Sequence, residues 1–292
     1  MTHSAQHRSG KGARDENFPV ASWLIKPRHR PVIHAFYEFV RVADDIADHP
    51  TLAPQDKLTR LDRLEASLVS CGGVEPEGVA LRAMLRRHSL SMRHAQDLLS
   101  AFRQDVTKQR YATWDELIDY CTRSAMPVGR FVLDVHGEPH ATWPASDALC
   151  AALQIINHLQ DCAADFRQLD RVYLPLDALA AHGIGVEALA DRHASPALQA
   201  CLRALAARTA DLLQQSDGLD VSVNDTRLAL EISVIQTLAN HLLTMLRVRD
   251  PLSERVHLTK VEALAAGATG SVRALLHRLL RLAPPTRRYQ TP

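Results

Sequence analysis

FYEFVRVADDIAD, residues 36–48, is the stretch that decides the fold of this chain. Phe36, Phe39 and Val40 recur at the spacing of an amphipathic helix, and Asp44 and Asp48 then stand four residues apart near its end. On a helix, that spacing puts both carboxylates on one face, one turn above the other. The segment therefore predicts a helix that is apolar along one side and acidic at its end.

NHLQDCAAD, residues 157–165, repeats the arrangement. Asn157, Asp161 and Asp165 follow one another at steps of four, so an amide and two carboxylates share one face of a second predicted helix. Like charges at this spacing destabilise an isolated helix by roughly 0.2 to 0.5 kcal/mol, and the first cluster lies at a helix end where the macrodipole disfavours anions. A solvated acidic face, with Arg41 paired to Asp44 or Asp45, is one interpretation. The recurrence of the pattern favours bound cations.

The ligand atoms offered by both faces are all oxygens, which suit Mg²⁺ better than zinc or iron. Because Mg²⁺ completes its shell with water and substrate phosphate, we expect a phosphate-bearing ligand between the two helices. Tyr37 and Arg41 precede Asp45 on the first helix, and Arg171 and Tyr173 follow the second cluster. By spacing alone, Arg41 fits an ion pair with Asp45 equally well, and Tyr173 fits a packing residue.

Composition excludes some classes of function. The 292 residues carry 34 Lys and Arg against 33 Asp and Glu, a net charge of +1, so no nucleic-acid partner is expected. Five scattered cysteines without a C-x-x-C motif, and a start that lacks the apolar region of a secretory signal, indicate a cytoplasmic protein. Residues 232–246 read as a buried helix, too short to span a bilayer. Residues 272–282 form a basic amphipathic pattern that fits inward packing or peripheral contact with the inner membrane surface.

Helical spacing runs through nearly the whole chain, as in Leu58, Leu61, Leu64 and Leu68. The alternation of apolar and polar residues that marks strands is weak, and the breaks between helices are short. The sequence thus predicts a single all-α domain over residues 17–283. Flexible segments are expected at residues 1–16 and 284–292.

With these features in place, the chain resembles the squalene/phytoene synthase family. Residues 36–48 resemble its first aspartate-rich motif, and residues 157–165 with the following 171–175 resemble its second. Residues 102–105, Tyr111, 120–129 and 255–260 resemble further parts of the family, so the resemblance covers roughly residues 17–282. It implies a class I isoprenoid synthase bundle, in which the aspartate-rich helices face each other across a central cavity.

The resemblance also implies roles for individual residues. Two or three Mg²⁺ ions and a diphosphate would be held by Asp44, Asp48, Asn157, Asp161 and Asp165. The four aspartates of this set would act in catalysis with Tyr37 and Arg41. The substrate would contact Asn17, Phe18, Tyr120, Ala125, Val128, Gln154, Asn157, Gln160, Arg171 and Tyr173. Candidates for the cavity wall, or for ordinary core packing, are Phe36, Phe39, Phe102 and Phe131.

Departures from the family pattern narrow the expected activity. Gln160 stands where an arginine usually precedes the first aspartate of the second motif, and residues 16–22 read ENFPVAS. This combination resembles the hydroxysqualene synthase branch. It implies conversion of presqualene diphosphate and water to hydroxysqualene and diphosphate, with substrate handed over from a presqualene diphosphate synthase.

Two alternatives of different kinds remain open at the level of sequence. One is head-to-head condensation of farnesyl or geranylgeranyl diphosphate to presqualene diphosphate, squalene, dehydrosqualene or phytoene. The other is a non-catalytic helical carrier of isoprenoid lipids, which would not require both acidic clusters to be complete.

Two further sites are disfavoured. GIGVEA, residues 183–188, matches the G-x-G-x-x-A fingerprint, but a short helix or turn is predicted before it, where a dinucleotide site requires a strand. No nicotinamide cofactor is therefore expected. Glu254 and His257 form the one Glu-x-x-His match, which is too few for a di-iron bundle.

Overall fold

The computed structural model of the protein describes residues 25–259, 261–262 and 265–272. Asn17, Phe18, the terminal segments 1–16 and 284–292, and all of the basic segment 272–282 except Val272 lie outside the described residues. The described chain is helical, and its β structure is a single isolated bridge between Arg110 and Val172. The all-α prediction is confirmed for this part of the chain.

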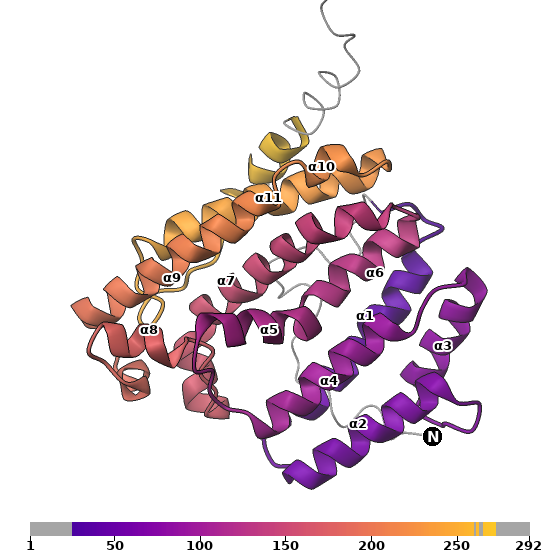
Figure 1. The fold of residues 1–292 in the computed structure, drawn as a ribbon, viewed down its shortest axis with the longest axis horizontal. Coiled ribbons are helices and arrows are strands. Elements are labelled where there is room, and N and C mark those ends of the chain that lie inside the picture. Colours follow the sequence, from indigo (N-terminus) through magenta and orange to yellow (C-terminus); the bar gives the residue numbers. More distant parts are fainter. Residues whose placement is uncertain (1–24, 260, 263–264, 273–292) are drawn as a thin grey trace, which may run out of the picture.

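The helices follow one another with short connections (Figure 1). Their bounds are α1 Arg30–Ala47, α2 Pro54–Val69, α3 Pro76–His88, α4 Arg93–Thr107, α5 Trp114–Ser124, α6 Met126–His136, α7 Trp143–Leu169, α8 Leu176–Ala181, α9 Pro196–Gln215, α10 Leu219–Ser222 and α11 Thr226–Leu246. Short 3₁₀ turns lie at His140–Thr142 and Val186–Ala190.

Local sequence signals explain many of the helix ends. Several helices, α1 and α7 among them, carry proline in the first turn, where its missing N–H has no helical partner to lose. Thr113 caps α5 by accepting a hydrogen bond from the Glu116 amide at 3.2 Å. Asp225 caps α11 in the same way, through the amides of Arg227 and Leu228. The long helices thus begin where capping chemistry allows.

The core has two parts, which meet at α6. One apolar cluster joins α1 to α4, shown in indigo and purple in Figure 1. The other joins α5, α7, α8, α9 and α11. The seam between them contains a cavity of about 340 Å³, with walls from α1, α6, α7 and α11. The predicted central cavity is therefore present.

α11 is the one helix among the described residues that is long and apolar enough to cross a membrane. Of its most apolar window, 67% is buried inside the protein, and the helix packs against α7, α9 and α10. This arrangement agrees with the prediction of a buried helix over residues 232–246.

The stretch 183–188 follows helix α8 and begins with Gly183 in the left-handed region, at a φ of 69°. It continues into a 3₁₀ turn from Val186 to Ala190. The strand, turn and helix of a dinucleotide fingerprint are not formed here.

Candidate active site

The ends of α1 and α7 lie together, and Arg171 joins them. Arg171 follows α7 and is buried, and its guanidinium donates a hydrogen bond to Asp48 Oδ1 at 2.5 Å and to the Ala47 carbonyl at 3.3 Å. Asp48 belongs to the first acidic motif and Arg171 follows the second, so the two motifs occupy the same end of the molecule.

The apolar cavity lies one to several turns before both motifs, on the same two helices. Tyr37 and Val40 on α1 and Leu153 on α7 line it. Leu153 precedes Asn157 by four residues and Val40 precedes Asp44 by four, so on each helix a cavity residue and an acidic-face residue share one side. The two helices therefore present a continuous surface that changes from apolar to acidic along its length.

The carboxylates of the first motif are affected by burial and by neighbouring charges. Burial, followed by the neighbouring Asp48, raises the pKa of Asp44 to about 7. Arg41 lies 3.4 Å from Asp45, which is buried, so the ion pair allowed by the spacing is formed. Lys57 on α2 donates to the Ala47 carbonyl at 2.9 Å and adds another cation nearby.

Asp105 on α4 extends this charged region inward. Its side chain is only 4% exposed and accepts hydrogen bonds from Tyr120 at 2.7 Å and from Tyr173 at 3.3 Å. Burial is the main cause that raises the pKa of Asp105 to about 6, and Asp48 contributes in the same direction. The ring of Tyr173 stacks on His158 with 3.6 Å between centroids.

The second motif is more open to solvent than the first. Asp161 is exposed, whereas Asp165 and Asn157 are partly buried. An amide and two carboxylates on one face of α7, together with the half-buried Asp44 and Asp48 of α1, form an all-oxygen donor set. Burial is the main cause of the raised pKa of Asp44, and the neighbouring Asp48 adds to it, so a bound cation would favour the ionised carboxylates. The all-oxygen donor set fits magnesium.

The remaining predicted substrate residues lie in different surroundings. Val128 lines the cavity at 39% exposure, and Tyr37 also lines it. Ala125 is buried at the junction of α5 and α6, and Gln154 contacts His158 with 3.1 Å between Nε2 atoms. The side-chain amide of Gln160 is buried and donates to the Val256 carbonyl, which places Gln160 against the segment that follows α11.

Of the four candidate wall aromatics, Phe36 and Phe131 line the cavity and stack on each other with 3.8 Å between centroids. Phe39 is fully buried in the α1–α4 core, and Phe102 packs against that core. The sequence offered both interpretations for each ring, and the structure divides the four between them.

Sequence reasoning assigned no role to two charged residues beside the first motif, Lys57 and Asp105. Lys57 lies in the first turn of the leucine-rich helix α2 and gave no local signal. Asp105 did give a local signal. It is a carboxylate near the C-terminal end of an amphipathic helix, where the macrodipole disfavours a negative charge.

A family model described as squalene/phytoene synthase matches residues 12–262. Among curated relatives, the hydroxysqualene synthase of Rhodopseudomonas palustris is 59% identical over 266 residues, covering 91% of each chain. That of Sinorhizobium fredii is 57% identical over 267 residues, again covering 91% of each chain.

Solved structures agree on the fold. The squalene synthase HpnC from Alicyclobacillus acidocaldarius superposes with a TM-score of 0.70 at 30% identity, covering 82% of this chain and 90% of that one. A dehydrosqualene synthase bound to a ligand gives a TM-score of 0.77 at 20% identity, covering 90% of this chain and 92% of that one. With two acidic helix faces above an apolar cavity and a family match over most of its length, this chain belongs to the squalene/phytoene synthase family.

Proposed function

We infer that this chain is a hydroxysqualene synthase, which converts presqualene diphosphate and water to hydroxysqualene and diphosphate. The observation that carries this conclusion is the identity of 59% and 57% to two hydroxysqualene synthases over 91% of the chain. The site supports it chemically, because a charged region for a diphosphate adjoins an apolar cavity for its hydrocarbon.

The residues that fit a diphosphate and its metal ions lie on α1 and α7. Asp44, Asp48, Asn157, Asp161 and Asp165 would hold Mg²⁺, which supplies Lewis-acid stabilisation of the departing diphosphate. Arg171 orients the first motif by binding Asp48 and the end of α1. Arg41 pairs with Asp45, and Asp44 would face the ligand together with Asp48, which Arg171 binds.

The cavity has the properties needed to protect a carbocation. Its wall is mostly aliphatic, and the stacked rings of Phe36 and Phe131 offer π faces to a cation. An apolar wall also delays capture by water until the carbon skeleton has rearranged. The polar side chains in this wall, Tyr37, Ser146, Cys150 and Glu231, mark the places where a water molecule can be held.

The test is a defined incubation of the purified protein with Mg²⁺ and presqualene diphosphate, without NADPH, in ¹⁸O-labelled water. Hydroxysqualene that carries ¹⁸O, formed in equal amount to diphosphate, is expected. Squalene formed only with NADPH, or product formed only from farnesyl diphosphate, would show a condensing or reductive enzyme instead. Failure to release diphosphate from either substrate would favour the carrier.

We propose that the enzyme works in the cytoplasm and receives its substrate from a presqualene diphosphate synthase. All five cysteines are free thiols, in keeping with a reducing compartment. Peripheral membrane contact through residues 272–282 remains part of this proposal. Co-sedimentation with anionic vesicles, compared between the full chain and a chain ending at residue 271, tests it: equal sedimentation would argue against such contact.

A further inference from the structure

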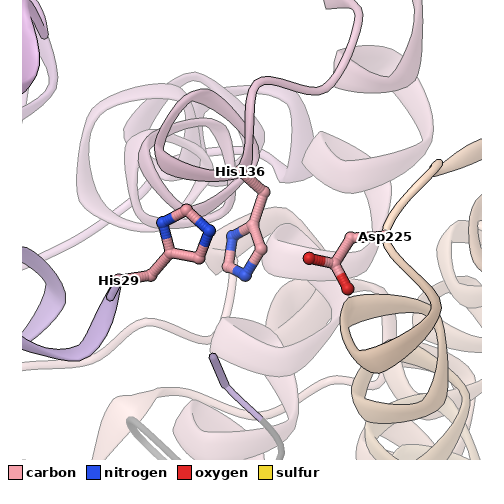
Figure 2. Close-up of side chains that lie close together, drawn as sticks. All are labelled: His29, His136 and Asp225. Carbon is pink, nitrogen blue, oxygen red and sulfur yellow. The ribbon is translucent and has the colours of Figure 1, made fainter. Parts of the chain in front are cut away.

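A second cluster of ligand-type side chains lies away from the acidic helices. It comprises His29, directly before α1, His136, the last residue of α6, and Asp225, the cap of α11 (Figure 2). One ligand atom from each residue lies within 4.8 Å of the other two. Three segments far apart in the sequence thus bring two imidazoles and a carboxylate to one point.

The protonation states suit metal binding. Burial, with His136 as the next cause, lowers the pKa of His29 to about 4, so its imidazole is neutral near pH 7. For Asp225, burial acts to raise the pKa, but the hydrogen bonds from Lys26 and the Arg227 amide hold it below its ordinary value. The carboxylate is therefore ionised, as a metal ligand requires.

His136 is already oriented as a ligand. Its Nδ1 lies 2.8 Å from the Val132 carbonyl, and because a carbonyl only accepts, Nδ1 carries the proton. Nε2 is then left with its lone pair, and it is buried without a hydrogen-bond partner among the described residues. A backbone carbonyl that fixes the second ring nitrogen is the usual support of a metal-bound histidine.

Two cationic side chains now occupy the approach to the cluster. Lys26 Nζ lies 2.9 Å from Asp225 Oδ2, and Arg28 Nε donates to His29 Nε2 at 3.0 Å. The Lys26 side chain is 36% exposed and Arg28 is exposed, so both can turn into solvent. Lys26 pairs with the Asp225 carboxylate and Arg28 bonds a neutral imidazole, and a divalent ion would replace both.

We propose that His29, His136 and Asp225 bind a transition-metal ion of the zinc class, at a site distinct from the magnesium site. Two nitrogens and one oxygen suit zinc and its neighbours, whereas magnesium prefers oxygen alone. His29 precedes Asp44 by fifteen residues, which corresponds to roughly 22 Å along a helix. The ion would act as a structural brace.

The brace has a defined place in the molecule. Ile25, Val132 and Leu228 line the cavity, and each lies within four residues of one of the three ligands. An ion at the cluster therefore ties the start of α1, the end of α6 and the start of α11 around the cavity, at the opposite end of α1 from its aspartates.

The test is zinc binding by the full chain in the presence of excess Mg²⁺, which keeps the acidic helices occupied. We expect one zinc ion per chain after desalting, and affinity reduced at least about 100-fold in His29→Gln and in His136→Gln, since even loss of an outer-shell partner costs 10- to 100-fold. His34→Gln is the matched control, because His34 is an exposed histidine on α1. Absence of retained zinc in the wild type, or unchanged affinity in both variants, would overturn the proposal.

A second measurement does not depend on how the variants fold. X-ray absorption of the zinc-loaded wild type is expected to show scattering from two imidazole rings. A shell made of oxygen alone, or one containing sulfur, would place the ion elsewhere and overturn the proposal. Circular dichroism of each zinc-free variant shows whether its helices are retained.

Discussion

The two acidic motifs share their spacing but differ in their surroundings. At the end of α1, Asp44 and Asp45 lie near Arg41 and the buried Asp105, and Asp48 lies near Lys57 and Arg171. On α7, Asp161 is exposed and Asp165 only partly buried. The same sequence pattern can therefore have different surroundings. Cationic side chains of the protein contact the first motif, whereas the second motif is accessible to ligands from solvent.

The largest effect is expected from Asp161→Asn. The exposed carboxylate contributes to the metal and diphosphate rather than to packing, so kcat should fall by about 10²- to 10³-fold, as on loss of one preorganised electrostatic contact. Resistance to urea should not change. Asp211→Asn, at an exposed position on α9, is the control and should retain full activity. Equal activity in the two variants would refute a role for the second motif.

Arg171→Met, unlike Asp161→Asn, should lower the stability of the folded protein. Loss of Arg171 leaves part of the Asp48 carboxylate without a donor and leaves the Ala47 carbonyl to Lys57 alone. The Asp48 side chain is 38% exposed, so solvent partly screens the ion pair. We therefore expect the free energy of unfolding to fall by about 2 kcal/mol, less than on loss of a fully buried pair. Urea unfolding measures it, with Arg203→Met on the surface of α9 as control. A change below about 0.5 kcal/mol would show that the first motif does not depend on this cation.

The pH dependence of stability follows from the raised pKa values of Asp44 and Asp105, about 7 and about 6 in the folded protein. At these two sites the folded state holds protons that the unfolded state releases, so in the metal-free protein their contribution to stability is greatest below about pH 4 and falls as pH rises towards 7. Asp105 should account for a loss on the order of 2 kcal/mol.

Urea unfolding between these pH values, with and without Mg²⁺, tests this expectation. Asp105→Asn should flatten part of the slope, and Mg²⁺ should restore stability at the higher pH by neutralising the carboxylates. The same dependence of stability on pH in the wild type and in Asp105→Asn would contradict the raised pKa of Asp105 in the folded protein.

The smallest effect is expected in the apolar half of the site, from Gly129→Ala. An added Cβ would clash with Ser146 Oγ and lie 2.6 Å from Cys150 Sγ, so these side chains must rotate or α6 and α7 must move apart. Overpacking lowers the free energy of unfolding by about 1 to 3 kcal/mol, and the higher helix propensity of alanine raises it by up to about 1 kcal/mol. The net loss should be about 1 kcal/mol by urea unfolding, with Mg²⁺ affinity unchanged. Altered Mg²⁺ affinity would show that the cavity and the acidic faces are less separate than their positions indicate.

Local pattern predicted the helices and the faces that they present. The four-residue steps in residues 36–48 and 157–165 were sufficient to place carboxylates on one side of each helix. The contact of Arg171 with Asp48 could not be found in this way, because 123 residues separate the partners and no periodicity reports a tertiary contact.

The same limit applies to the other residues that sequence reasoning missed or left open. Lys57 and Asp105 reach the first motif from α2 and α4, and the His29, His136 and Asp225 cluster is assembled from three segments. For Arg41, spacing permitted both a phosphate contact and an ion pair, and only the fold shows the pair with Asp45. Sequence periodicity identifies which residues share a helix face, whereas the tertiary packing determines which residues that face contacts.

The central claim is that both motifs hold one diphosphate through Mg²⁺. Calorimetric binding of inorganic diphosphate with Mg²⁺, in the wild type, Asp44→Asn, Asp161→Asn and the double variant, tests it most directly. If the motifs hold one ligand, the double variant should bind only slightly more weakly than the single variant with the lower affinity. The effects of substitutions at residues that bind one ligand together are not additive. Independent losses that add in free energy would contradict the claim.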